Sequence, residues 1–76
     1  MNRLIDEKIV EIMKHTNADY SNSYQLLLSL GGKYSDAEKL ALLLRQGLTI
    51  NQIKELHQKG MFKYDADVLL SMLSTM

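Results

Sequence analysis

The fold is decided by the stretch from residue 34 to residue 52, YSDAEKLALLLRQGLTINQ, which contains two helix starts and the stop between them. Ser35 and Glu38 have the spacing of a capping box, in which each side chain accepts a hydrogen bond from the backbone N–H of the other residue. Gly47 is the residue type that best tolerates the left-handed conformation just past a helix end. The pattern therefore predicts a helix over about residues 35–46.

A second helix start follows directly along the chain. Thr49 and Gln52 repeat the capping box in its Thr-x-x-Gln form. Leu48 and Ile53 stand at the two positions of a hydrophobic staple, one on either side of that start. These residues predict a helix over about 50–59, separated from the preceding helix by a tight turn.

Three more helices are predicted outside this stretch, over about residues 2–15, 21–30 and 66–75. In the first of them, Ile5, Ile9 and Ile12 recur at helical spacing and form an apolar stripe. The pair Gly31-Gly32 ends the second helix, and Asp65 is placed to cap the start of the last one. The chain is therefore read as a succession of short helices.

The composition leads to the same fold class. Leucine occurs 14 times and methionine five times, against seven isoleucines and valines together, and proline is absent. Straight or γ-branched apolar side chains favour helix over sheet. We therefore expect one all-α domain over residues 1–76, a compact bundle of four to five short helices. At this length the domain is near the lower limit of what folds alone.

Composition also excludes several classes of protein. The absence of cysteine rules out disulfides and thiolate chemistry. The formal net charge is zero, which argues against a polyanion binder that uses its whole surface. The longest unbroken apolar run, 40–44, is five residues, and the early acids Asp6 and Glu7 do not fit a secretory signal. We expect a soluble cytoplasmic protein with no membrane contact.

The sequence contains no recognisable catalytic constellation. His15 and His57 are the groups that titrate near neutral pH. Glu11 lies four residues before His15, which offers two metal ligands where a structural zinc site takes four. The serines lie at predicted caps or on helices, and the segment 31–33 lacks the spacing of a phosphate loop. We expect no enzymatic activity, no metal, no cofactor and no small-molecule substrate.

The middle of the chain is locally basic, and its spacing of glycine and apolar residues is similar to that of a DNA-binding motif. The segment from Lys39 to Lys63 contains five basic residues and one acidic residue, Glu55, so its net charge is +4. Residues 43–56 are similar to the helix-turn-helix pattern, in which a glycine opens the turn and apolar residues anchor the second helix. Leu43 departs from that pattern, because the position four before the turn glycine is normally small.

If this motif binds DNA, the helix at about 50–59 is the recognition helix. Asn and Gln side chains at its start can read adenine edges, and the basic side chains would contact phosphates. The candidate nucleic-acid contacts are Arg45, Asn51, Gln52, Lys54, Lys59 and Lys63.

Binding of a protein partner is the competing hypothesis, and the one we favour. Met61, Phe62 and Tyr64 cluster in the connector before the last helix, and Met72 lies on that helix. Methionine and aromatic side chains adapt well to partner surfaces. The alternative is that Met61 and Phe62 fold inward as core plugs. In size and composition the chain resembles the compact adaptors and inhibitors carried by phages and mobile elements.

Self-association is a further expectation. The second and third helices carry leucines around nearly their whole circumference, and such helices belong in the middle of an assembly. A domain this small cannot easily cover both from within, so we expect a homodimer. The alternative is that the shorter flanking helices supply the cover.

Overall fold

Five α-helices and one short 3₁₀ turn make up 79% of the computed structural model, which describes residues 3–74. The elements are α1 (Arg3–Thr16), α2 (Tyr20–Ser29), α3 (Tyr34–Arg45), α4 (Ile50–Gln58), η1 (Met61–Lys63) and α5 (Ala66–Ser74). The prediction of an all-α bundle is confirmed, and no strand occurs between residues 3 and 74. The predicted helix ends at Asn2 and Thr75 lie outside the described residues.

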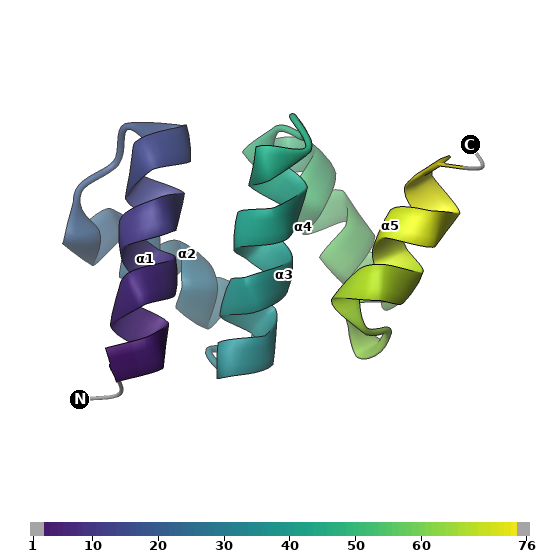
Figure 1. Cartoon of the computed structure of the whole chain (residues 1–76), viewed down its shortest axis with the longest axis horizontal. Helices are drawn as coiled ribbons and strands as arrows, with labels where there is room; N and C mark the ends of the chain where they lie inside the picture. Colours follow the sequence, from purple (N-terminus) through teal and green to yellow (C-terminus); the bar gives the residue numbers. More distant parts are fainter. Residues whose placement is uncertain (1–2, 75–76) are drawn as a thin grey trace.

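The helices form two layers, with α1, α3 and α5 side by side in front and α2 and α4 behind them (Figure 1). The helix α3 is central, because it contacts each of the other four α-helices. The bundle measures 35 × 21 × 18 Å, and its radius of gyration is 11.5 Å. A folded chain of this length is expected to have a radius of gyration of about 11 Å.

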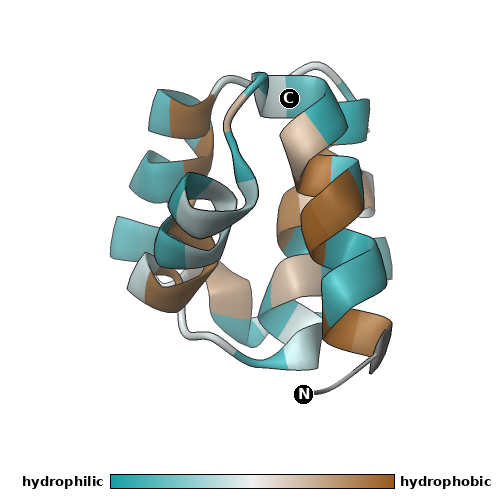
Figure 2. Cartoon of the chain, turned by 90° about the vertical axis from the view of Figure 1, so that its left-hand side faces the viewer, coloured by the Kyte–Doolittle hydropathy of each residue, from teal (hydrophilic) through white to brown (hydrophobic). Residues whose placement is uncertain are grey.

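The core fills the space between α3 and its neighbours. The main cluster of buried side chains comprises Ile12, Leu30, Leu40, Ala41, Leu43, Leu44, Ile53, Phe62 and Leu69. A smaller one comprises Ile9, Leu27 and Ala37. Hydrophobic and hydrophilic segments alternate along the helices at the α1 and α2 end (Figure 2). Leu40, Leu43 and Leu44 of α3 are buried by the flanking helices, whereas Leu42 is half-buried and Leu28 on α2 remains 47% exposed.

The start of α3 differs from the prediction. The helix begins at Tyr34, with Lys33 as its N-cap, and the predicted partners Ser35 and Glu38 are both exposed. The carboxylate of Asp36 accepts the bond from the Lys33 backbone N–H, at 3.1 Å. This carboxylate lies against Gly31, at a point where any Cβ would collide with it. Packing of Asp36 on the end of α2 therefore starts the helix earlier than a Ser35 cap allows.

The start of α4 is as predicted. The backbone N–H of Gln52 donates to the Thr49 hydroxyl at 3.2 Å, and the Thr49 N–H donates to the Gln52 side-chain oxygen at 2.8 Å. Leu48 packs against the core cluster that contains Ile53, as a hydrophobic staple requires. This reciprocal cap fixes where α4 leaves the turn.

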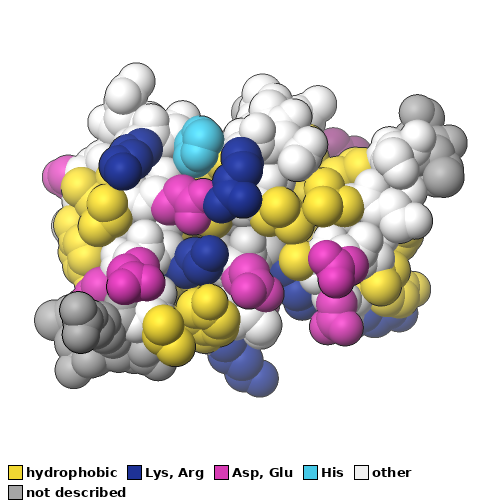
Figure 3. All heavy atoms as spheres, viewed as in Figure 1, with side chains coloured by type: hydrophobic (Ala, Val, Ile, Leu, Met, Phe, Trp, Pro, Cys, Tyr) yellow, Lys and Arg dark blue, Asp and Glu magenta, His cyan; other side chains and the backbone are white. Residues whose placement is uncertain are grey.

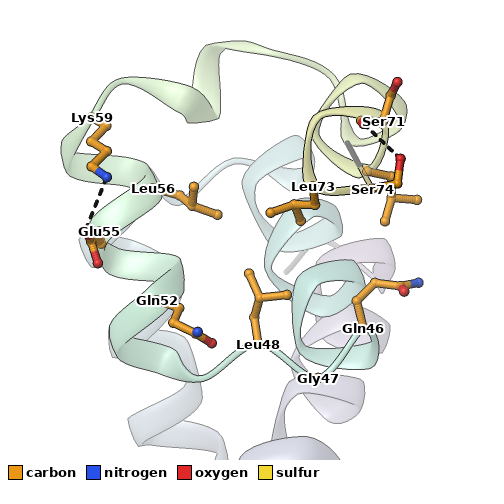
Figure 4. Close-up of a pocket in the computed structure, with 11 residues that line it drawn as sticks. Gln46, Gly47, Leu48, Gln52, Glu55, Leu56, Lys59, Ser71, Leu73 and Ser74 are labelled. Atoms are coloured by element: carbon orange, nitrogen blue, oxygen red, sulfur yellow. Dashed lines mark hydrogen bonds and ion pairs between the residues drawn. The ribbon is translucent and has the colours of Figure 1, made fainter. Parts of the chain in front are cut away.

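The turn between α3 and α4 also has the predicted backbone. Gly47 has a φ of +95°, in the left-handed region. Its N–H donates to the Leu44 carbonyl at 3.0 Å, and the N–H of Leu48 donates to the Leu43 carbonyl at 3.1 Å. These two bonds form a Schellman motif, which satisfies carbonyls at the end of α3. The turn aims Leu48 into the space between α4 and α5 (Figure 4).

Candidate functional site

An open groove of about 860 Å³ lies between α4 and α5, with the turn after α3 at its base (Figure 4). The two helices are linked through the short connector that contains η1, and they diverge from it. Ligand-binding clefts typically have volumes of about 300–1,000 Å³. The groove therefore has the volume of a ligand-binding site.

The floor of the groove is apolar and comes from three separate segments. Leu48 from the turn, Leu56 from α4 and Leu73 from α5 point toward one another (Figure 4). Each of the three is half-buried and packs against the edge of the core. Leu70 completes the apolar lining. The floor thus continues the hydrophobic core outward to a surface that solvent reaches.

These leucines follow from the core stripes of α4 and α5. Leu56 is three residues after the fully buried Ile53, and Leu73 is four residues after the buried Leu69. Residues three and four apart share one side of a helix. Leu56, near the connector end of α4, and Leu73, near the opposite end of α5, are both left half-buried at the edge of the core and line the groove.

The rim of the groove is polar without net charge. Glu55 and Lys59 form an ion pair along α4, with 3.2 Å between carboxylate oxygen and ammonium nitrogen. On α5, the Ser74 hydroxyl donates to the Ser71 carbonyl at 2.9 Å. Gln52 stands beside them on the α4 rim, and its side-chain oxygen is already used in the cap. The groove therefore favours an apolar ligand surface over a charged one.

The connector that sets the angle between α4 and α5 is fixed to the core. Phe62 is only 7% exposed, and its ring meets the His57 ring edge-on, with centroids 5.4 Å apart. The buried ammonium of Lys39 donates to the Phe62 carbonyl and lies 5.9 Å from the centre of the Phe62 ring. Met61 is half-buried against the same core cluster. Phe62 is therefore buried in the core and Met61 packs against it, which is the inward arrangement given above as the alternative to a partner contact.

The other two predicted partner contacts lie away from the groove. Tyr64 is exposed, and the Lys63 ammonium lies 5.2 Å from the centre of its ring. Met72 is half-buried on α5 and is not part of the groove lining. Because Phe62 is buried and Met61 and Met72 are half-buried, the four predicted contacts do not form one exposed surface. In the sequence, the groove is indicated by Leu56 and Leu73, which follow the core residues Ile53 and Leu69 by one helical turn.

The predicted nucleic-acid contacts are mostly engaged within the chain. Arg45 bonds to Glu11 on α1, Lys59 pairs with Glu55, and Lys63 lies over Tyr64. Asn51 and Lys54 are exposed on α4, and Lys39, part of the basic segment, is buried. Acidic and basic side chains alternate over α1 and α3 on the face seen in Figure 3. Arg45 and Lys59 are therefore paired with carboxylates, whereas the contact of Lys63 is with an aromatic ring and Lys54 is exposed.

Helices α1 and α3 are joined by the ion pair of Glu11 with Arg45. The hydrogen bond from Arg45 lowers the pKa of the Glu11 carboxyl, and the charges of Arg45 and Lys8 add to this effect. The Lys8 ammonium lies 3.8 Å from the Glu11 carboxylate. Glu11, considered above as a metal ligand beside His15, is thus used to hold two helices together.

The described residues contain neither a metal cluster nor a helix that could span a membrane. Between residues 3 and 74, no three acidic or imidazole side chains are placed to share a metal ion. Every helix in that range is too short or too polar to cross a bilayer.

No family model, no curated protein and no solved structure matches this chain.

Proposed function

We propose that the protein is a small, non-catalytic interaction module of the cytoplasm, and that its groove binds an amphipathic helix of a partner protein. The observation that carries this proposal is the convergence of Leu48, Leu56 and Leu73 beneath an uncharged rim. Grooves of this kind receive helices whose apolar residues recur at i, i+3 or i+4, and i+7. Such docking is how a compact adaptor or inhibitor acts.

The dimensions of the groove set the size of the ligand. One wall is α4, whose nine residues span about 13 Å, or roughly two and a half turns. A partner helix of similar length presents two or three apolar side chains to the floor. Contacts of this size lie at the low end of specific interfaces, so we expect a dissociation constant of order micromolar, about −8 kcal/mol.

The charges of the rim define the chemistry of the partner. Because Glu55 and Lys59 neutralise each other, the rim gives no preference for a strongly acidic or basic helix. We therefore propose a ligand with leucine-like anchors and polar, weakly charged flanks. DNA binding by α4 is the weaker candidate, since Arg45 and Lys59 are held in ion pairs and Gln52 in the cap.

Selection of helical peptides tests the proposal directly. A displayed library of amphipathic helices is selected against the full chain, and the enriched peptides are titrated by calorimetry. We expect enriched sequences with apolar residues at helical spacing, and at least tenfold weaker binding to the variants Leu56→Gln and Leu73→Gln. The matched control Leu28→Gln changes an exposed leucine outside the groove and retains the affinity.

Two outcomes contradict the proposed function. One is that enriched peptides bind Leu56→Gln and Leu73→Gln as tightly as the original chain. The other is that duplex DNA binds at submicromolar protein with a steep loss of affinity in salt, which is the signature of counterion release. The second result makes the exposed face of α4, with Asn51 and Lys54, the functional surface.

A further inference from the structure

Helix α5 is held to the bundle mainly through one side chain. Among the nine residues of Ala66–Ser74, Leu69 is the buried one, at 1% exposed, and it belongs to the main core cluster. Val68 is 42% exposed, and the apolar side chains at 70, 72 and 73 are half-buried. By comparison, seven of the twelve residues of α3 are buried. Because apolar burial is the main force that holds elements together, α5 is attached more weakly than α3.

Most of α5 also carries no charge that could fasten it. Residues 68–74 contain no acidic or basic side chain, so this part of the helix cannot form an ion pair with the bundle. Helices α1 and α3, in contrast, are joined by the ion pair of Glu11 with Arg45. The attachment of α5 beyond its first two residues therefore does not include an ion pair, and Leu69 is its main apolar anchor.

The connector before α5 is fixed more firmly than the helix itself. Phe62 is 7% exposed, and its carbonyl accepts a hydrogen bond from the buried ammonium of Lys39. Tyr64 and Asp65, which follow, are exposed. Tyr64 has an extended backbone, with φ −87° and ψ 153°. The boundary between the fixed connector and the weakly attached helix therefore lies at residues 64–65.

We propose that α5 detaches from the bundle and redocks on it as one unit, pivoting at residues 64–65, while α1–α4 and η1 stay folded. Proteins open locally in cooperative segments, and this opening costs less free energy than global unfolding. Hinges are commonly a few loop residues at the end of an element. Helix α4 also has one buried residue, Ile53, but it lies between the bonded turn at Gly47 and the connector with Phe62. It therefore stays in place when α5 leaves.

Detachment of α5 removes one wall of the groove. Leu70 and Leu73 line the groove from α5, whereas Leu48 and Leu56 belong to segments that stay in place. The complete groove consequently exists only while α5 is docked. A ligand that contacts both walls binds the docked state and shifts the population toward it. This consequence rests on the proposed function of the groove, whereas the detachment itself does not.

Native-state hydrogen exchange of the full chain, followed by NMR, tests the detachment. We expect the amides of residues 69–73 to share one protection factor, at least about tenfold below that of amides 40–44 in α3. Their exchange should depend less on urea, because detachment exposes less surface than global unfolding. Protection that declines steadily toward residue 74 is fraying, and it contradicts release as a unit. Equal protection in α5 and α3 also overturns the inference.

Two substitutions separate detachment from global unfolding. Ile9→Val removes a methyl group from the smaller core cluster, which contains no residue of α5. It destabilises the docked and the detached states equally, so the protection of α3 falls about fivefold and that of α5 is unchanged. Leu69→Ala destabilises the docked state alone and lowers the protection of α5. An equal fall in both helices of Ile9→Val, or an unchanged α5 in Leu69→Ala, contradicts the proposal.

A selected groove peptide tests the link between docking and binding. At about a hundred times its dissociation constant, a helix that contacts both walls raises the protection of residues 69–73 about a hundredfold. Unchanged protection with bound peptide overturns the link between α5 docking and the groove. Failure to select any peptide counts against the proposed function alone, because exchange in the free chain decides the detachment without a ligand.

Discussion

The ammonium of Lys39 donates a hydrogen bond to the carbonyl oxygen of Phe62, which lies 23 residues later in the chain. Lys39 is only 7% exposed, and its charge has the Phe62 ring beside it. A buried cation is stable only where its surroundings replace the water it has lost. This bond therefore joins the central helix α3 to the connector that holds α4 and α5 apart.

Replacement of Lys39 tests that function. Lys39→Met keeps most of the aliphatic length but leaves the buried Phe62 carbonyl without its donor, so we expect a loss of about 1–2 kcal/mol of unfolding free energy. Urea denaturation measures it. Lys54→Met, a change at an exposed lysine, stays within about 0.5 kcal/mol. Equal effects at Lys39 and Lys54 contradict the importance of the bond.

Two glycines with positive φ should respond differently to alanine. A Cβ added at Gly47 meets nothing within 4 Å beyond the adjoining residues, so Gly47→Ala costs only the backbone strain, about 1 kcal/mol. At Gly31 the new Cβ meets the Asp36 carboxylate, which then loses its bond to the Lys33 N–H. We expect a larger loss of thermal stability for Gly31→Ala. The reverse order of melting temperatures refutes the packing of Asp36 on Gly31.

The ion pair of Glu11 with Arg45 predicts a pH dependence. Because the folded-state pKa of Glu11 lies below its ordinary value of 4.5, the pair stabilises the fold above that pH. This stabilisation is lost as the pH falls through the lowered pKa. For a partly exposed pair it amounts to at most about 1 kcal/mol.

Unfolding curves measured between neutral and acidic pH test the pair. Glu11→Gln should flatten the acid side of the stability profile, because it removes the group whose pKa differs between the two states. Arg45→Gln should do the same, and the double variant should add little to either change. Additive effects of the two substitutions mean that the side chains do not interact.

Local patterns in the sequence predict the features that involve neighbouring residues. The bonds of Thr49 with Gln52 and the left-handed Gly47 follow from residue types within a few positions, and both are confirmed. The cap at Ser35 fails because the position of Asp36 depends on Gly31 at the end of another helix. A capping pattern alone carries no information about that contact.

Long-range contacts decide the candidate site, and the sequence does not reveal them. The backbone carbonyl of Phe62 accepts a hydrogen bond from Lys39, 23 residues earlier, and Arg45 is bonded to Glu11, 34 residues earlier. The groove lies between α4 and α5, where Leu56 and Leu73 are only partly covered. Helical periodicity shows that these leucines flank the core, but it does not show the angle between the two helices.

The most direct test of the proposed function is a methyl NMR titration with a selected helical peptide. In the leucine-labelled chain we expect chemical-shift changes and intermolecular contacts at Leu48, Leu56, Leu70 and Leu73, which line the groove. Leu28, on the exposed side of α2, should be unaffected by peptide. Peptide contacts at Leu28, with the four groove leucines unchanged, would contradict the assignment of the groove as the binding site.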